Sequence, residues 1–231
     1  MIQNRKFALA FRAGSFLFIT SGILKQIGVF KGIITPVSFM FYTILSNILA
    51  ILLFLILTVR TAKSLRESPR GDSGWYSRFE MVCVVDLLVT FIVYWVLLAP
   101  IMTSLWTFEN ITLHAIAPLL CLLDYVLFSK ARCLKYRDVY FVCIFPLLYI
   151  AMISIAGSAG YVYWLADDGS PVHYPYFFLD YDSLGYTALA YIGAILIFFL
   201  LLSHCIYLVD RRLRRSLHTK NHCHEDEKHI M

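Results

Sequence analysis

Six runs of about 20 predominantly apolar residues constrain the fold of this chain more than any other feature. A helix of that length crosses the roughly 30 Å hydrocarbon core of a bilayer. Only 15% of the 231 residues are charged, against about 25% in a typical soluble domain. The sequence therefore predicts an all-α polytopic membrane protein, in which residues 1–209 form one bundle of six transmembrane helices. The expected spans are about 7–30, 36–60, 80–102, 110–129, 138–160 and 185–209.

The starts of the first two spans can be read from local signals. The first span follows Arg5 and Lys6 as a signal peptide would. It is too long for the apolar part of such a peptide and no A-x-A site follows it, so we expect a retained helix. The second span begins with Thr35 and Pro36, a plausible N-cap followed by proline at the first helical position.

The positive charges fall almost entirely on one side of the predicted membrane. Seventeen of the twenty lysines and arginines lie in the N-terminus, in 60–78, in 130–137 or in the basic tail 210–231. By the positive-inside rule both termini are expected to be cytoplasmic, in a multi-pass protein of the cell (inner) membrane. The formal net charge of +5 thus follows from topology, and no nucleic-acid partner is expected.

The cysteines and the tail histidines do not indicate a disulfide framework or a metal site. None of the six cysteines falls in a loop on the outer side of the predicted topology, where disulfides form. His222, Cys223 and His224 form only a short run without a second ligand pair. We expect no metal and no cofactor.

A layer of polar residues is expected within the outer leaflet, at similar depths on three helices. It consists of Lys25 on the first span, Thr43 on the second and His114 on the fourth, and Asn47 lies four residues after Thr43 on the same helix face. The Thr43 hydroxyl could instead bond back to the carbonyl of Phe39. His114 could hold two helices together, and Lys25 could extend to the headgroups.

A second charged layer is expected near the cytoplasmic boundary. Arg12, Asp86 and Asp124 lie within a few residues of it. A structural ion pair between Arg12 and Asp124 is the simplest way to keep both charges inside the bundle.

Residues 161–184 form a long acidic and aromatic loop on the outer side. A loop of this length is often a lid or a binding element, although its aromatic residues also suit a membrane interface. Asp180 and Asp182 just precede the last span and could approach His114 from above.

Threonine and histidine together are a minimal set for nucleophilic acyl transfer. A threonine hydroxyl becomes a nucleophile when a neighbouring base takes its proton, and histidine can accept that proton and return it to a leaving alkoxide. Asn47, Lys25 or a backbone N–H could stabilise the oxyanion, and Asp180 and Asp182 are further candidates for contact with substrate.

Three stretches carry a family resemblance that covers the chain up to about residue 209. They are FYTILSN (41–47), LHAIAPLLCLLDYVLF (113–128) and FFLDYDSLGY (177–186). They resemble the androgen-induced/ADTRP-type integral membrane threonine hydrolases, most closely their bacterial six-helix relatives. The long acidic loop and the third stretch are features of the bacterial branch.

The resemblance implies a threonine hydrolase that cleaves fatty acid esters of hydroxy fatty acids. Thr43 and His114 match the family's threonine early in the second helix and its histidine in the fourth. The expected partners are then membrane lipids and an amphipathic lipid ester. Two other functions fit the polar residues: a small transporter with an intramembrane ionisable relay, and a non-catalytic lipid-binding protein.

Overall fold

The computed structural model describes the backbone of residues 2–71, 77–128 and 134–228, and side chains up to residue 212. Within these residues six helical segments are long and apolar enough to span a membrane. This confirms the predicted all-α polytopic bundle. The segments are α1 (Arg5–Gln26), α2 (Tyr42–Glu67), Arg78–Ile101, Phe108–Leu127, Tyr136–Ser158 and Thr187–Arg212.

Three of these spans combine several helical elements, and the sixth is part of a longer helix. The third joins α3 (Ser77–Val93) to a π-helical turn, Tyr94–Leu98. The fourth contains α4 (Phe108–Ile111), a second π-helical turn (Thr112–Ile116) and α5 (Ala117–Leu127). The fifth begins as a 3₁₀ helix, Tyr136–Cys143, and continues as α6 (Ile144–Ser158). The sixth is the first part of α8 (Thr187–Lys228).

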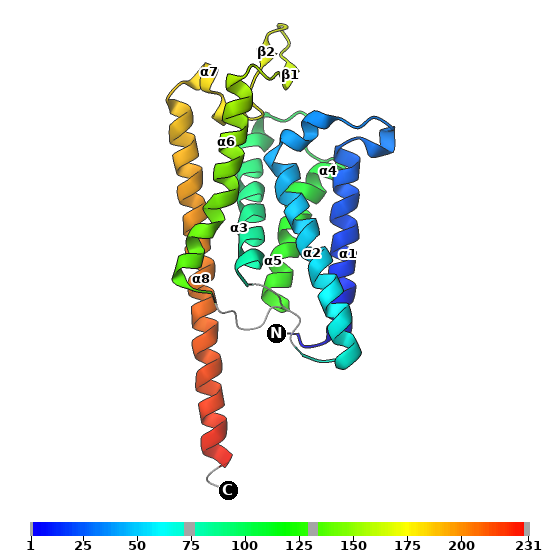
Figure 1. Ribbon diagram of the computed structural model, residues 1–231, viewed down its shortest axis with the longest axis vertical. Coiled ribbons are helices and arrows are strands. Elements are labelled where there is room, and N and C mark those ends of the chain that lie inside the picture. Colours follow the sequence, from blue (N-terminus) through cyan, green and yellow to red (C-terminus); the bar gives the residue numbers. More distant parts are fainter. Residues whose placement is uncertain (1, 72–76, 129–133, 229–231) are drawn as a thin grey trace.

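The helix α3 lies in the middle of the bundle (Figure 1). On one side its residues share an apolar core with α1, α2 and α5. On the other they pack with the fifth span and α8. The strands β1 (Trp164–Leu165) and β2 (Pro171–Val172) form an antiparallel hairpin at one end, which we call the hairpin end. The N-terminus lies at the other end, which we call the terminal end.

The predicted tail is a continuation of the last helix. The helix α8 comprises 42 residues, to Lys228, and its last part extends beyond the bundle at the terminal end (Figure 1). The side chains of His222, Cys223 and His224 lie outside the described residues.

The second span begins later than the sequence predicts. Thr35 and Pro36 do start a helical segment, but it is a 3₁₀ helix that ends at Met40. Phe41 is extended, with φ −88° and ψ 135°, and the α-helix begins at Tyr42. Thr43 therefore lies in the first turn of α2, whereas a helix that began at Pro36 would place it about two turns in. Pro36 correctly marks the start of a helical segment, but it does not reveal that the segment ends at Met40 and that the backbone is extended at Phe41.

The loop after α6 is held on the bundle by an aromatic contact that requires a glycine. Tyr174 is buried, and its ring lies where a Cβ atom on Gly157 of α6 would have to be. We expect Gly157→Ala to lower the free energy of unfolding by about 1–3 kcal/mol, because the ring has to move. Thermal unfolding of the detergent-purified protein measures this effect.

The matched control is Gly14→Ala in α1, where no atom lies within 4 Å of the added methyl group. Alanine in a helix interior is favoured over glycine by about 0.5–1 kcal/mol. Equal stability changes in the two variants would contradict the proposed packing of the loop.

Candidate active site

Thr43 and His114 lie in direct contact at the hairpin end of the bundle. The hydroxyl oxygen Oγ1 of Thr43 is 3.1 Å from Nε2 of His114. Thr43 comes from the first turn of α2 and His114 from the π-helical turn of the fourth span. The structure thus places the hydroxyl against the imidazole and not against the carbonyl of Phe39. This is hydrogen-bonding distance between a potential nucleophile and a potential base.

The hydrogen-bond partner of the second ring nitrogen of His114 determines which of the two nitrogens carries the proton. Nδ1 lies 3.1 Å from the backbone carbonyl oxygen of Asn110, and a carbonyl can only accept a hydrogen bond. Nδ1 therefore donates, and the neutral ring presents its Nε2 lone pair to the Thr43 hydroxyl. The carbonyl of Asn110 orients the base, a role that a carboxylate has in serine hydrolases.

A proline contributes to the position of His114. Pro118 lies four residues after His114 and has no N–H to donate to the His114 carbonyl. The indole Nε1 of Trp95 donates to that carbonyl instead, at 3.1 Å. The backbone also widens into a π-helical turn here, closed by the Ala117 N–H and the Thr112 carbonyl. Such turns are frequent at functional sites.

Tyr94 lies flat against the imidazole. Its ring centroid is 3.6 Å from that of His114 and the two planes differ by 17°. Tyr94 opens the π-helical turn of the third span, so two irregular turns on neighbouring spans bring the two rings together. The Tyr94 hydroxyl is buried and has no hydrogen-bond partner among the described residues. A buried group of this kind requires an explanation, and a ligand in the adjoining cavity would supply one.

The pair opens into a cavity of about 470 Å³, which we call the histidine cavity. Its volume is in the usual range for small-molecule sites, about 300–1,000 Å³. Besides Thr43 and His114, its walls include Gln26 of α1 and Trp164 of the hairpin. Trp164 stacks on Phe41 with an interplanar angle of 8° and a centroid distance of 6.3 Å. The hairpin therefore covers the segment that leads into α2.

Tyr176 of the loop reaches the first turn of α2. The amide groups of Tyr42 and Thr43 have no backbone acceptor among the described residues, as expected at a helix start. Burial raises the pKa of the Tyr176 phenol, and interactions with the side chain and backbone of Thr43 and the backbone of Tyr42 oppose that rise. The Tyr176 ring packs edge-on against Phe41, with the centroids 5.9 Å apart, and lines the histidine cavity beside Thr43.

Asn47 lies near the pair but is used in the structure of the bundle. Its Nδ2 group donates to the carbonyl of Thr43 at 2.8 Å and to the carbonyl of Leu113 at 3.2 Å. Both of its N–H donors are therefore engaged, and Asn47 joins α2 to the turn that carries His114. It is not among the residues that line the histidine cavity.

The other predicted contact residues also do not line the histidine cavity. Lys25 forms an ion pair with Glu109, with Nζ and Oε2 3.2 Å apart. Asp180 caps α7 (Tyr181–Leu184) by accepting from the amides of Asp182 and Ser183. Asp182 lines a separate cavity beside Tyr174.

Arg12 and Asp124 form a buried, bidentate ion pair toward the terminal end. Arg12 Nε lies 2.7 Å from Asp124 Oδ1, and Nη2 lies 3.0 Å from Oδ2. Arg12 Nη1 also donates to the hydroxyl of Thr61 at 2.7 Å. The structure therefore brings together the two residues for which the sequence predicts a structural pair.

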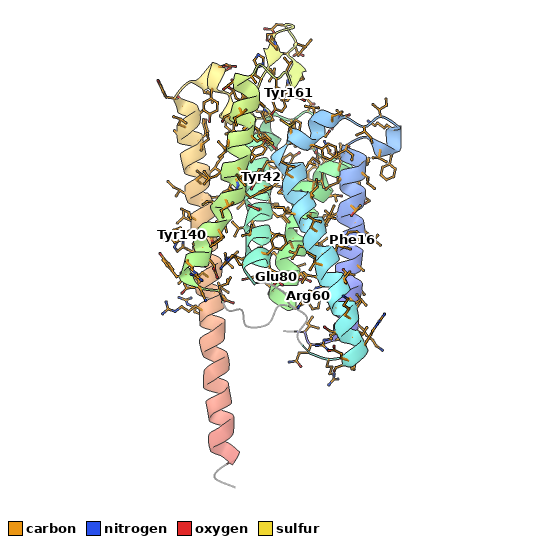
Figure 2. All side chains as sticks on the ribbon, in the orientation of Figure 1. Phe16, Tyr42, Arg60, Glu80, Tyr140 and Tyr161 are labelled. Atoms are coloured by element: carbon orange, nitrogen blue, oxygen red, sulfur yellow. The ribbon has the colours of Figure 1, made fainter. Side chains whose placement is uncertain are left out.

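Asp86 does not belong to that charged layer. Its Oδ1 accepts a hydrogen bond from the Tyr42 hydroxyl at 3.0 Å. Figure 2 labels Tyr42 inside the bundle, where its ring packs against Tyr149 with the centroids 5.0 Å apart. The aspartate is thus connected to the helix start that carries Thr43. Its sequence position near the end of a span does not reveal this contact.

The aromatic residues of the loop divide into two groups that the sequence does not distinguish. Tyr161 and Trp164 are partly exposed, as expected at a membrane interface, whereas Tyr163 and Tyr174 are buried. Tyr176 and Tyr94 both contribute to the site and neither is predicted as a site residue. The nearest sequence signal for the site is Pro118, four residues after His114. A mid-span proline leaves a carbonyl free for a partner such as Trp95.

Comparisons of the chain with protein-family models, curated proteins and solved structures find no match. The family resemblance described above therefore stays a prediction.

Proposed function

We propose that this protein is an intramembrane hydrolase of lipid esters, such as fatty acid esters of hydroxy fatty acids. The observation that carries the proposal is the contact of 3.1 Å between Thr43 Oγ1 and His114 Nε2. The pair lies in a sizeable cavity at the end of a membrane-spanning bundle. An amphipathic lipid from the surrounding bilayer can bring its ester bond to the pair at that end of the bundle.

The reaction follows from the protonation state of the imidazole. His114 Nε2 accepts the hydroxyl proton as Thr43 Oγ1 forms a bond to the ester carbonyl carbon. When the tetrahedral intermediate collapses, the bond to the alcohol oxygen breaks and the imidazolium returns the proton to that oxygen. Water then attacks the acyl-threonine with His114 again as base, which releases the fatty acid and restores the hydroxyl.

The oxyanion needs donors close to Thr43. The Tyr94 hydroxyl is buried without a partner among the described residues, and the Tyr176 ring packs against Phe41 just before the first turn of α2. Both residues line the histidine cavity. In this proposal they take the role for which Asn47 and Lys25 are candidates in the sequence, since those two are engaged elsewhere.

The proposed orientation follows the distribution of positive charge. Arg60, Lys63 and Arg66 lie on the last turns of α2, and Arg211 and Arg212 lie on α8 beyond the apolar part of its span. Placing this end in the cytoplasm satisfies the positive-inside rule. The hairpin and the Thr43–His114 pair then face the opposite side of the membrane.

The test uses the acyl-enzyme that the mechanism requires. A fluorophosphonate probe is expected to label the detergent-purified wild type and not Thr43→Ala, and only the wild type should cleave a fatty acid ester of a hydroxy fatty acid. The control is Thr58→Ala, which removes a threonine hydroxyl further along α2, outside the histidine cavity. Full labelling of Thr43→Ala, or an inert wild type across several lipid esters, would overturn the proposal.

A further inference from the structure

A second cavity begins at Thr43 and extends into the bundle. It lies between the third span, α6 and α8, and it measures about 70 Å³. None of the described residues that line it carries a charge. We call it the apolar cavity. On the same measure one water molecule needs about 10–15 Å³, so the cavity holds a short stretch of a chain but neither a ring system nor a headgroup.

The two cavities meet at the nucleophile. Thr43, Tyr94 and Tyr176 line both of them. His114 and Asn110 line only the histidine cavity. An ester carbonyl in contact with Thr43 therefore has two directions in which its substituents can extend, and only one of them passes the imidazole.

The chemistry of the pair distinguishes the two directions. His114 Nε2 must return its proton to the alcohol oxygen as the ester bond breaks, so that oxygen has to lie on the histidine side. We infer that the leaving alcohol occupies the histidine cavity and that the acyl chain of the ester extends into the apolar cavity. This assignment rests on the proposed function and adds to it the binding site for the acyl chain.

The far end of the apolar cavity limits the chain that it can hold. Along α8 its wall is formed by Ile192, Ile195 and Phe199, which are spaced by three and four residues and so lie on one face of the helix. At 1.5 Å per residue, Phe199 lies about 6 Å beyond Ile195. Phe199 is buried and packs against α3 residues. Phe199 thus forms the floor, and Ile195 a side wall, of the proposed acyl site.

The experiment measures kcat/KM for two series of esters. In one series the acyl chain varies in length and the alcohol is constant, and in the other the alcohol varies and the acyl chain is constant. Ile195→Phe fills the cavity and is expected to lower kcat/KM for the longest acyl chain that the wild type accepts by about 10-fold or more. Phe199→Ala opens the floor and is expected to shift the preference to chains longer by several carbons. Neither variant should change selectivity for the alcohol. The control is Ile197→Phe on the exposed face of α8.

The possible outcomes separate this inference from the proposed function. If the wild type cleaves esters but both variants keep its acyl-length profile, the acyl site is wrong and the hydrolase proposal stands. If the two variants change selectivity for the alcohol but not for the acyl chain, the alcohol occupies the apolar cavity, and the inference is overturned. If the wild type cleaves no ester, both fail together. Fluorophosphonate labelling of each variant shows that Thr43 and His114 remain assembled.

Discussion

Replacing His114 with glutamine is expected to lower kcat for ester hydrolysis by about 100-fold or more, with KM changed much less. Glutamine fills part of the space of the imidazole and can still contact Thr43, but it cannot take the hydroxyl proton. General base catalysis contributes about 10²–10⁴-fold, and the loss of a group that acts only in the transition state lowers kcat and not substrate binding. Steady-state kinetics in detergent or in liposomes measure both constants.

His204 provides a matched control for this replacement. Like His114, it bonds through Nδ1 to the backbone carbonyl four residues earlier, at 2.7 Å. Its Nε2 lies 3.4 Å from the Tyr136 hydroxyl and so is remote from Thr43. His204→Gln should leave kcat within a few fold of the wild type. Equal losses in the two variants, or a His114→Gln protein with wild-type kcat, would contradict the assigned role of His114.

The second large effect is expected at the buried ion pair. We expect Asp124→Leu to lower the free energy of unfolding by about 3–5 kcal/mol, because it leaves the buried charge of Arg12 without its bidentate partner. Arg12 is fully buried and Asp124 is 3% exposed, so solvent screens neither charge. The measurement is the thermal unfolding temperature in detergent, together with the yield of monodisperse protein.

Two further variants distinguish the ion pair from simple side-chain loss. The double replacement Arg12→Met with Asp124→Leu should recover most of the stability, because apolar side chains can replace a buried pair at little cost. Glu109→Gln disrupts the more exposed pair with Lys25 and should cost about 1 kcal/mol or less. A double variant as unstable as Asp124→Leu would show that the charges are not the source of the effect.

The bundle can be predicted from the sequence because each span is determined locally. A run of about 20 apolar residues must be a helix in lipid, since every backbone polar group has to find a partner within the segment. The positions of Thr43 and His114 near the ends of their spans also place the two residues in one leaflet. Sequence alone does not show that the two side chains face each other, because the rotation of each helix depends on packing against its neighbours.

The contacts that the sequence does not reveal lie where distant segments meet. The sequence treats Tyr176 as one of several interfacial aromatic residues, but the loop packs its ring against Phe41, just before α2. Asp86 lies near a predicted charged layer, but its partner is Tyr42 on another helix. Asn47 has the right type and spacing for a role at the site, and yet two carbonyls take its donors. In each case the deciding contact crosses between elements, and no local periodicity encodes it.

The late start of α2 has an electrostatic consequence for Thr43. Aligned peptide dipoles leave the first turn of a helix with a partial positive charge, equivalent to roughly half an elementary charge. Had the helix begun at Pro36, Thr43 would lie in its neutral interior. Because the helix begins at Tyr42, any negative charge on the threonine oxygen or on the attacked carbonyl lies at the positive pole of a 26-residue helix. In a low-dielectric bundle that field is little screened, so the break at Phe41 stabilises charge where the proposed reaction creates it.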